Sequence, residues 1–310
     1  MPVVRDVAER AFGLIRGRWP KPLGYLVLSL TSRSPETFTE KVRARMAFDR
    51  RAELSRLADK VEVRSYIQDR VGDGHLPRLF AVILPSLGER IPWDALPEHF
   101  VAKAAHGSGA VVLVSPHGKD WIGPARRLRW EKFAVSPQDL DRSAVEALVR
   151  RWSKLRYEHS PPTRFPEWIY RDIPPRVLFE ELLTDGSGVA PRDFKFFMFD
   201  GECALIQVDE ARFEGHRRDL FDSRWVPVDA TLTFPRASTP LPAPPDLAAM
   251  ISIAEKLSAG WDFMRVDLYA VDGRIVVGEL TMTPGGGREP FKPRSFDGEL
   301  GAKWRQAFIQ

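Results

Sequence analysis

Two acidic residues near the end of the chain have the spacing that would bring them together on a β-hairpin. Asp267 lies in the run 263–271, Glu279 lies in the run 274–280, and Asp272-Gly273 between the two runs is a strong signal for a tight turn. A turn there would place Asp267 roughly opposite Glu279. Two adjacent carboxylates both stay ionised at low cost only when a cation lies between them. Mg²⁺ suits such a pair, because it binds carboxylate and phosphate oxygens together.

Arg265 and Thr281 alternate with these acids and should share their face of the hairpin. An arginine in this position could stabilise negative charge that develops during a reaction. The alternative is a surface hairpin with one ion-paired arginine and two solvated acids. The apolar residues 275–278 favour a buried sheet instead, where unpaired acids are costly.

Two lysines have surroundings that suit phosphate binding. Lys103 ends the predicted strand 100–103 and precedes the turn 106–109, His-Gly-Ser-Gly, whose backbone N–H groups could contact a polyphosphate. The turn lacks the Gly-Lys-Ser/Thr of a Walker A loop, and a Gly-Ser-Gly turn alone is usually a plain hairpin. Lys195 stands in the aromatic strand 193–199 and needs a partner there, for which phosphate is one candidate.

Further charged residues lie at the ends of other predicted elements. Glu180 and Glu181 end the predicted strand 176–181, where a carboxylate could meet an adenine amine or ribose hydroxyls; exposed acids at a strand edge are the alternative. Asp59, a typical N-cap residue, opens a predicted helix over 59–70. Lys60 and Arg64 lie one turn apart on that helix and present two cations on one face.

Composition places the chain among ordinary globular proteins. It has 310 residues, of which 44% are hydrophobic and 28% charged, and a formal net charge of +4. This mild excess is far below the basic stripes of nucleic-acid binders, so we expect no nucleic-acid partner, and an anionic small substrate explains it equally well. The single cysteine, Cys203, excludes an intrachain disulfide and fits a reducing compartment, so a cytoplasmic location is expected.

The remaining elements follow from periodicity. Residues 1–55 are predicted to be helical. The apolar positions in 4–14 suit an amphipathic helix, which more commonly packs on the domain but can also lie on a membrane surface. The most apolar early stretch, 23–31, has nine residues and is too short to span a bilayer, so no stable membrane insertion is expected. Strands are predicted over 110–114 and 203–208. A proline-rich connector, 235–245, precedes a helix over 246–259, and a loop followed by a last helix closes 289–310.

Taken in order, these pieces closely resemble the TupA-like ATP-grasp proteins, a group linked to teichuronopeptide and other cell-surface polysaccharide synthesis. The resemblance runs from about Lys41 to Trp304. The motifs that carry it are Asp59-Lys60 with Arg64, Phe100-Val-Ala-Lys103, His106-Gly-Ser-Gly109, Arg176-Val-Leu-Phe-Glu-Glu-Leu-Leu183, Asp193-Phe-Lys195, Phe199-Asp-Gly201, Arg265-Val-Asp-Leu-Tyr269 and Gly278-Glu-Leu-Thr281.

The resemblance implies an α+β fold of the ATP-grasp type, in which two α+β subdomains clasp ATP. It divides the chain into a helical N-terminal extension (1–55), a lid-side subdomain (56–180) and a C-terminal subdomain with the metal site (181–310). The implied activity is an ATP- and Mg²⁺-dependent, ADP-forming ligase that joins a carboxylate to an amine through an acyl-phosphate. The implied substrates are small molecules or saccharides, with a uronate and an amino acid or amino sugar as the family-level pair.

By the same resemblance, Lys60, Lys103 and the Gly107-Ser108-Gly109 turn would contact the ATP phosphates, and Lys195 would reach the γ-phosphate. Glu180 and Glu181 would lie at the nucleoside, with the Leu183 backbone against the adenine. Asp267 and Glu279 would hold Mg²⁺, aided by Thr281 where most ATP-grasp enzymes have Asn, and Arg265 would stabilise the tetrahedral intermediate. Gly285, Gly286 and Arg288 would form the acceptor loop, as in D-alanine–D-alanine ligases. Arg212, near a strand end, is a further candidate for an anionic acceptor.

Two other classes of function stay open. A glycosyltransferase or a scaffold of a polysaccharide locus is one, although Asp219 and Asp222 have the wrong spacing for an Asp-x-Asp motif. A kinase on the same fold is the other, and its product would be a stable phosphoester rather than an amide. The oligomeric state is open.

Overall fold

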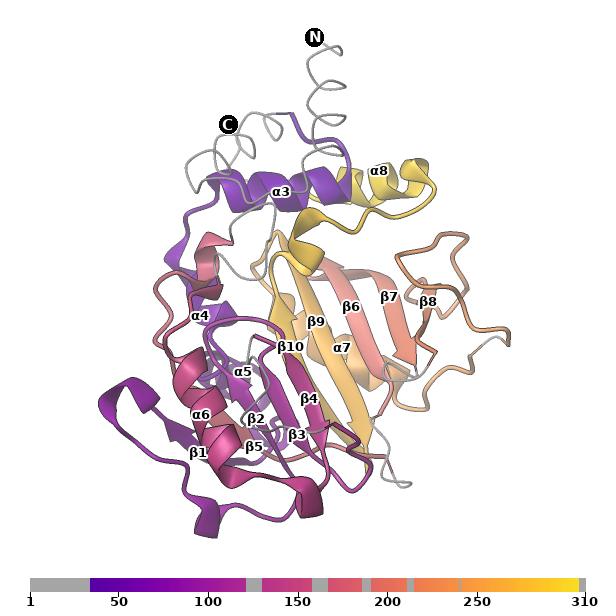
Figure 1. The fold of residues 1–310 in the computed structure, drawn as a ribbon. Coiled ribbons are helices and arrows are strands. Elements are labelled where there is room, and N and C mark those ends of the chain that lie inside the picture. Colours follow the sequence, from indigo (N-terminus) through magenta and orange to yellow (C-terminus); the bar gives the residue numbers. More distant parts are fainter. Residues whose placement is uncertain are drawn as a thin grey trace, which may run out of the picture.

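The computed structural model describes residues 34–120, 130–157, 167–185, 191–210, 215–239 and 241–306. Within these ranges the chain forms two five-stranded sheets with helices packed against them (Figure 1). The expected α+β class is confirmed. The amphipathic helix predicted near the N-terminus lies outside the described residues.

The first sheet has the strand order β1-β5-β2-β3-β4. Its pairs are antiparallel except for β3 and β4, which are parallel. Helix α6 (Arg142–Trp152) begins at Asp141, whose side chain accepts hydrogen bonds from the first-turn N–H groups, and its buried face joins the core of this sheet. The strands are β1 (Leu79–Ile83), β2 (Phe100–Ala104), β3 (Val111–Val114), β4 (Lys132–Val135) and β5 (Val177–Glu180).

The second sheet has the order β10-β9-β6-β7-β8, and all its pairs are antiparallel. Both predicted tight turns are confirmed: Asp200-Gly201 has φ values of 49° and 84°, and Asp272-Gly273 has 50° and 71°. Positive φ at both central residues matches the twist of a two-residue hairpin. The strands are β6 (Asp193–Phe199), β7 (Glu202–Glu210), β8 (Arg217–Phe221), β9 (Phe263–Val271) and β10 (Arg274–Thr281).

Strand β6 divides its side chains between two cores, as alternation requires. Phe194, Phe196 and Met198 join the main core with α7 (Leu247–Ser258), whereas Phe197 and Phe199 join a second cluster with α3 (Phe38–Phe48) and α8 (Arg294–Lys303). Figure 1 shows α3 and α8 across one end of the second sheet. Lys195 lies on this face beyond the helices, where the sheet presents polar side chains.

A buried arginine fixes α3 to the second sheet. Arg45 is 0% exposed and donates to Asp262 Oδ1 at 2.5 Å and to the carbonyl oxygens of Phe263 and Met282 at 2.9 and 3.2 Å. Its guanidinium also lies 4.5 Å from the ring centroid of Trp304. The acids and carbonyl oxygens around it satisfy a charge that would otherwise be costly to bury.

The helix predicted from Asp59 begins later than expected. Two short helices, α4 (Ala52–Ala58) and α5 (Val63–Val71), flank Asp59. The Asp59 carboxylate accepts from the N–H groups of Val61 and Glu62 and also pairs with Arg176. The aspartate therefore caps the turn that separates the helices, and Lys60 lies in that turn.

Several single 3-10 turns complete the fold: η1 (Asp73–His75), η2 (Pro85–Leu87), η3 (Trp93–Ala95), η4 (Pro137–Asp139), η6 (Trp168–Tyr170) and η7 (Pro284–Gly287). None of the helices in the described ranges combines the length and the apolar character needed to cross a bilayer.

Candidate functional site

The β9–β10 hairpin brings the predicted acids together in the expected register. Asp267 pairs with Glu279 and Arg265 pairs with Thr281, with a bulge between Val277 and Glu279. Arg265 binds Asp267 through two hydrogen bonds of 2.7 Å and donates to Thr281 Oγ1 at 3.1 Å. Thr281 in turn donates to Glu279 Oε1 at 3.0 Å. Four polar side chains therefore form one connected group on a single sheet face.

Lys195 joins this group from the next strand. It is the cross-strand neighbour of Asp267, and its Nζ lies 2.8 Å from Asp267 Oδ2 and also donates to Asp193. Burial alone would lower the pKa of Lys195, but the charges of Asp267 and Asp193 outweigh burial and hold the pKa above its ordinary value. The ammonium is therefore charged and fixed beside the acidic pair. Lys195 therefore has carboxylate partners, which explains how a lysine is accommodated in a strand rich in phenylalanine.

Lys60 and Lys103 approach the same hairpin from the first sheet. Lys60 donates to the carbonyl oxygen of Gly107, and Lys103 donates to Glu180. Burial lowers the pKa of Lys60, opposed by the charge of Glu279, whereas the charge of Glu180 outweighs burial and raises the pKa of Lys103. The charge of Glu279 acts to raise the pKa of both lysines, and all three residues line one recess.

One recess is lined by part of the predicted set, namely Lys60, Lys103, Glu180 and Glu279. It lies between α4–α5, the first sheet and β10, and Arg64 also lines it, 3.6 Å from Glu180. The acid that faces Asp267 across the hairpin is part of its wall. Its polar lining residues are Lys60, Arg64, Lys103, Glu180 and Glu279.

The predicted phosphate turn is clamped by aromatic rings. A Cβ at Gly107 would lie 2.3 Å from the Trp130 ring and 2.6 Å from Tyr157, so only glycine fits. Trp130 Nε1 also donates to the Ser108 carbonyl oxygen at 2.6 Å, and Gly109 has a φ of 89°. The Gly107 carbonyl oxygen, which accepts a hydrogen bond from Lys60, is thus fixed in place.

Further predicted site residues are Glu181 and Leu183, expected at the nucleoside, and Arg212, expected at the acceptor. Glu181 accepts from the Arg78 N–H at 3.0 Å and pairs with Arg274 at 2.7 Å. Leu183 is half-buried in the segment after β5. Their roles at the adenine stay predictions, and Arg212 lies outside the described residues. Cys203 is half-buried against the main core, and burial raises its pKa to about 12.

The predicted acceptor loop is the turn η7, held under α3. Gly285, Gly286 and Gly287 have φ values of 59°, 57° and 63°, which favour glycine. Arg43 donates to the Gly287 carbonyl oxygen at 2.7 Å, and Arg288 donates to that of Gly285 at 3.1 Å. The three glycines therefore turn the chain sharply at the end of the hairpin.

Three acids in this region were not anticipated. Glu167 is 5% exposed and accepts from Thr283 Oγ1 at 3.0 Å, and burial raises its pKa to about 7. Nothing in the sequence links residues 116 positions apart. Asp193 and Asp209 lie beside Lys195. Strand alternation along β6 and β7 could have predicted that these acids share a sheet face with the lysine.

The donor set fits Mg²⁺ bound together with phosphate. Over the described stretches, no group of three or more His, Cys, Asp or Glu side chains could hold a metal unaided. Asp267 and Glu279 supply two carboxylates, and Mg²⁺ is usually held by one or two carboxylates plus phosphate oxygens and waters. A site completed by a nucleotide is consistent with this pair.

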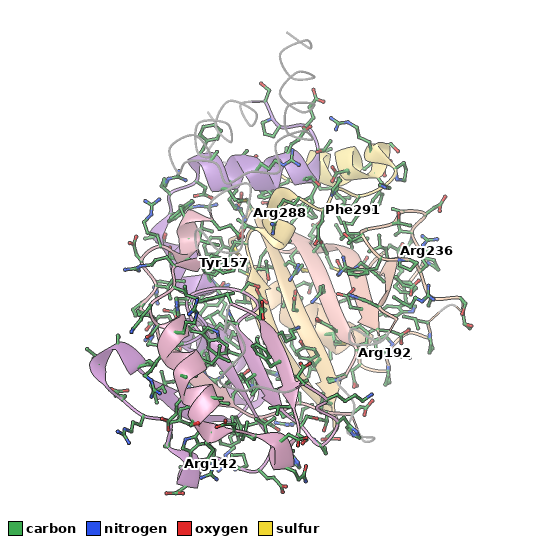
Figure 2. The ribbon with its side chains drawn as sticks, viewed as in Figure 1. Arg142, Tyr157, Arg192, Arg236, Arg288 and Phe291 are labelled. Atoms are coloured by element: carbon green, nitrogen blue, oxygen red, sulfur yellow. The ribbon has the colours of Figure 1, made fainter. Side chains whose placement is uncertain are left out.

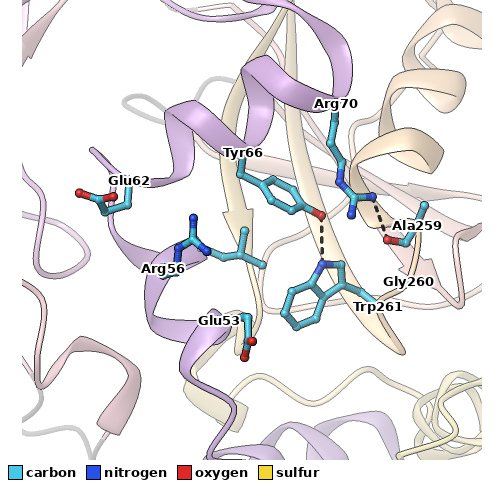
Figure 3. A pocket seen from close by; sticks show the side chains of 9 residues that line it. Glu53, Arg56, Glu62, Tyr66, Arg70, Ala259, Gly260 and Trp261 are labelled. Atoms are coloured by element: carbon cyan, nitrogen blue, oxygen red, sulfur yellow. Dashed lines mark hydrogen bonds between the residues drawn. The ribbon is translucent and has the colours of Figure 1, made fainter.

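A second cavity, of about 300 Å³, lies on the other side of α4–α5 (Figure 3). Its wall includes Tyr66, whose hydroxyl accepts from Trp261 Nε1 at 3.0 Å, and Arg70, which donates to the Ala259 carbonyl oxygen at 2.9 Å. None of the predicted site residues lines this cavity. Leu57 borders both this cavity and the recess described above.

Comparison with solved structures returns ATP-grasp ligases at low identity. D-alanine–D-alanine ligase from Bacillus anthracis is 16% identical with a TM-score of 0.41, over 75% of this chain and 59% of the ligase. The ATP-grasp ligase PsnB with its minimal precursor is 13% identical with a TM-score of 0.41, over 81% of this chain and 60% of PsnB. The chain thus spans about 60% of the length of these two proteins. Comparison with curated proteins gives no match.

A protein-family model gives a stronger result. The model described as TupA-like ATPgrasp matches residues 40–305, which include both sheets and every described site residue named above. The chain therefore belongs to the TupA-like ATP-grasp family.

Proposed function

We propose that this protein is an ATP-dependent ligase that activates a carboxylate as an acyl-phosphate and joins it to an amine. One observation carries the proposal: Lys60, Lys103 and Glu279 line one recess, and Glu279 faces Asp267, which holds Lys195. Cations from three segments and a pair of acids are the parts that phosphoryl transfer from a nucleotide requires.

In the first step, a carboxylate oxygen of the substrate attacks the γ-phosphorus of ATP. The bond from that phosphorus to the bridging oxygen breaks, and ADP leaves with the electron pair. Lys60 and Lys103 would neutralise phosphate oxygens, each exchanging its present partner, Gly107 or Glu180, for phosphate. Lys195 would bind the transferred group. Positioning and charge neutralisation supply most of the catalysis in such reactions.

Asp267 and Glu279 are the residues that would hold Mg²⁺. A bound Mg²⁺ would supply charge neutralisation at the phosphates and fix their orientation. Arg265 orients the Asp267 carboxylate through its two hydrogen bonds, and Thr281 orients Glu279. These contacts keep both acids aimed at the same side of the hairpin.

In the second step, the amine attacks the acyl carbon. A C–N bond forms, the bond from carbon to the phosphate oxygen breaks, and phosphate leaves with the electron pair while the amine loses a proton. Arg265 would stabilise the oxyanion that develops, and the N–H groups of the η7 glycines lie at the adjacent end of the hairpin. Water is the competing nucleophile, so the recess must exclude it.

The proposed substrates follow from the family. A uronate or another saccharide carboxylate of a cell-surface polysaccharide or its precursor is the acid, and a cytoplasmic location would give access to ATP. In this proposal, the lid-side subdomain (56–180) and the C-terminal subdomain (181–310) clasp the nucleotide between them. The residues of the recess support this division, because they come from both parts of the chain.

The test is a substrate panel. The protein is incubated with Mg-ATP and pairs of uronates with amino acids or amino sugars, and ADP, phosphate and the new product are measured. The proposal expects ADP and phosphate with an amide mass, and loss of all three in Asp267→Asn. A stable phosphoester would instead identify a kinase, and ATP-independent transfer from a nucleotide sugar would identify a glycosyltransferase.

A further inference from the structure

Glu167 is a buried acid with no cation in direct contact among the described residues. It lies at the start of η6, and its Oε2 accepts from Thr283 at the entrance to η7. No arginine, lysine or histidine of the described ranges forms an ion pair with it within 4.0 Å. Burial raises its pKa to about 7, against the lowering effects of the hydrogen bond from Thr283 and of the charge of Arg288. A buried carboxylate of this kind is stabilised by a cationic ligand.

Arg288 approaches the same point from the opposite end of the glycine turn. A Cβ built on Gly286 would lie 3.3 Å from Glu167 Oε1, 3.4 Å from Arg288 Nε and 3.6 Å from Arg288 Nη2. A negative and a positive group therefore lie next to the same point beside Gly286. Arg288 is exposed, whereas Glu167 is buried. Figure 2 shows Arg288 at the η7 end of the second sheet, with Tyr157 nearby.

Aromatic side chains close the buried side of this point. Tyr157 and Tyr170 pack edge to face with ring centroids 4.8 Å apart, and the charge of Glu167 raises the pKa of both, in addition to burial. Both hydroxyls therefore stay neutral near pH 7, which leaves Glu167 as the acid that can ionise there. Tyr157 also packs against Gly107 of the phosphate turn.

We propose that Glu167 and Arg288 select the amine substrate, and that this substrate is an α-amino acid, with its amino group at Glu167 and its carboxylate at Arg288. A carboxylate and a guanidinium that lie next to one point beside a glycine match the two charges that an α-amino acid carries on a single carbon. An amino sugar has a positive group but no carboxylate to pair with Arg288. A guanidinium is well suited to carboxylate recognition because its donors form a planar fork.

This inference rests on the proposed ligase function, since it names the acceptor of that reaction. Glu167 is a specificity-determining residue in this account. It lies next to Thr283, two positions beyond the Thr281 that pairs with Arg265, so an amino group held there is directed towards the reacting end of the hairpin.

The experiment measures binding, so it does not depend on turnover. The standard L-amino acids are titrated calorimetrically into the protein with Mg-AMPPNP, and the best binder is compared with its α-hydroxy acid and its α-carboxamide. We expect each analogue to bind at least about tenfold more weakly, because the α-hydroxy acid leaves the buried Glu167 without its ammonium partner and the α-carboxamide leaves Arg288 without a carboxylate. Glu167→Gln should lose affinity for the amino acid, but its affinity should no longer depend on the amino group. Arg288→Gln should behave likewise towards the carboxylate.

Glu299→Gln, an exposed acid on α8, is the matched control and should bind as the wild type does. Arg288→Gln keeps the test decisive if Glu167→Gln does not fold, because Arg288 lies on the surface. The inference is overturned if no amino acid binds, if the α-hydroxy acid binds as tightly, or if amino sugars bind instead. Amino-acid binding without phosphate release in the substrate panel would reject the ligase reaction and leave the binding site standing.

Discussion

Lys195 and Asp267 are direct cross-strand neighbours on β6 and β9, and their charged atoms lie 2.8 Å apart. Asp267 faces Glu279 on its other side, so the lysine and the two acids form one row across three adjacent strands. The row is already neutralised in part by Lys195 and Arg265. A divalent ion arriving with a nucleotide would therefore meet acids that are positioned in advance, and phosphate would give the lysine a second anionic partner.

Lys103 is expected to serve both nucleotide binding and stability. Lys103→Met should weaken Mg-ATP binding at least about tenfold, and it should cost about 1–3 kcal/mol of unfolding free energy because Glu180 loses its closest cation. Nucleotide titration and urea unfolding measure the two effects. Adding Glu180→Gln should restore stability without restoring binding. Equal ATP affinity in Lys103→Met and the wild type would contradict the assignment.

Glu167 should make stability depend on pH. Burial raises its pKa from 4.5 to about 7, so the folded state holds the proton more tightly than the unfolded state. Its contribution to the unfolding free energy is full below about pH 4.5 and is lost as pH rises to about 7, by up to about 3 kcal/mol. Glu167→Gln lacks this dependence, so its stability relative to wild type should rise over that interval.

Urea unfolding across the same pH interval measures this difference. Glu299→Gln, which changes an exposed acid, should run parallel to the wild type throughout. A difference between Glu167→Gln and wild type that stays constant with pH would show that Glu167 titrates normally.

Arg45 should be the main electrostatic anchor of α3. Arg45→Met leaves Asp262 and Asp49 with the more exposed Arg51 in place of their buried cation, and breaking a buried pair in this way typically costs about 3–5 kcal/mol. Arg294→Met removes an exposed partner of Glu40 and should cost less than about 1 kcal/mol. Chemical unfolding of both variants gives the comparison, and similar losses for the two would contradict the anchor role.

The hairpins and their register could be predicted from the sequence because the signals are local. Asp272-Gly273 marks the turn, and strand alternation then places Asp267 opposite Glu279. The same reasoning separated Lys195 and Phe197 from Phe196 on β6, and the two cores confirm it. The helix boundary at Asp59 was wrong because a capping aspartate and a turn aspartate look alike in sequence.

The contacts between distant segments could not be predicted from pattern. Glu167 meets Thr283 only because η6 packs beside η7, and Arg45 meets Asp262 only because α3 packs on the second sheet. Order along the chain linked Lys60, Lys103 and Glu279 through a family resemblance, whereas their shared recess is a property of the folded chain. Tertiary packing decides such contacts.

The central claim is that Asp267 and Glu279 bind a divalent ion with the nucleotide. The most direct test is calorimetric titration with AMPPNP, with and without Mg²⁺, of the wild type, of Asp267→Asn/Glu279→Gln and of the control Glu299→Gln. The account predicts Mg²⁺-dependent binding in the wild type and the control, and no gain from Mg²⁺ in the double variant, which remains folded. Equal Mg²⁺-dependent affinity in the double variant and the wild type would contradict it.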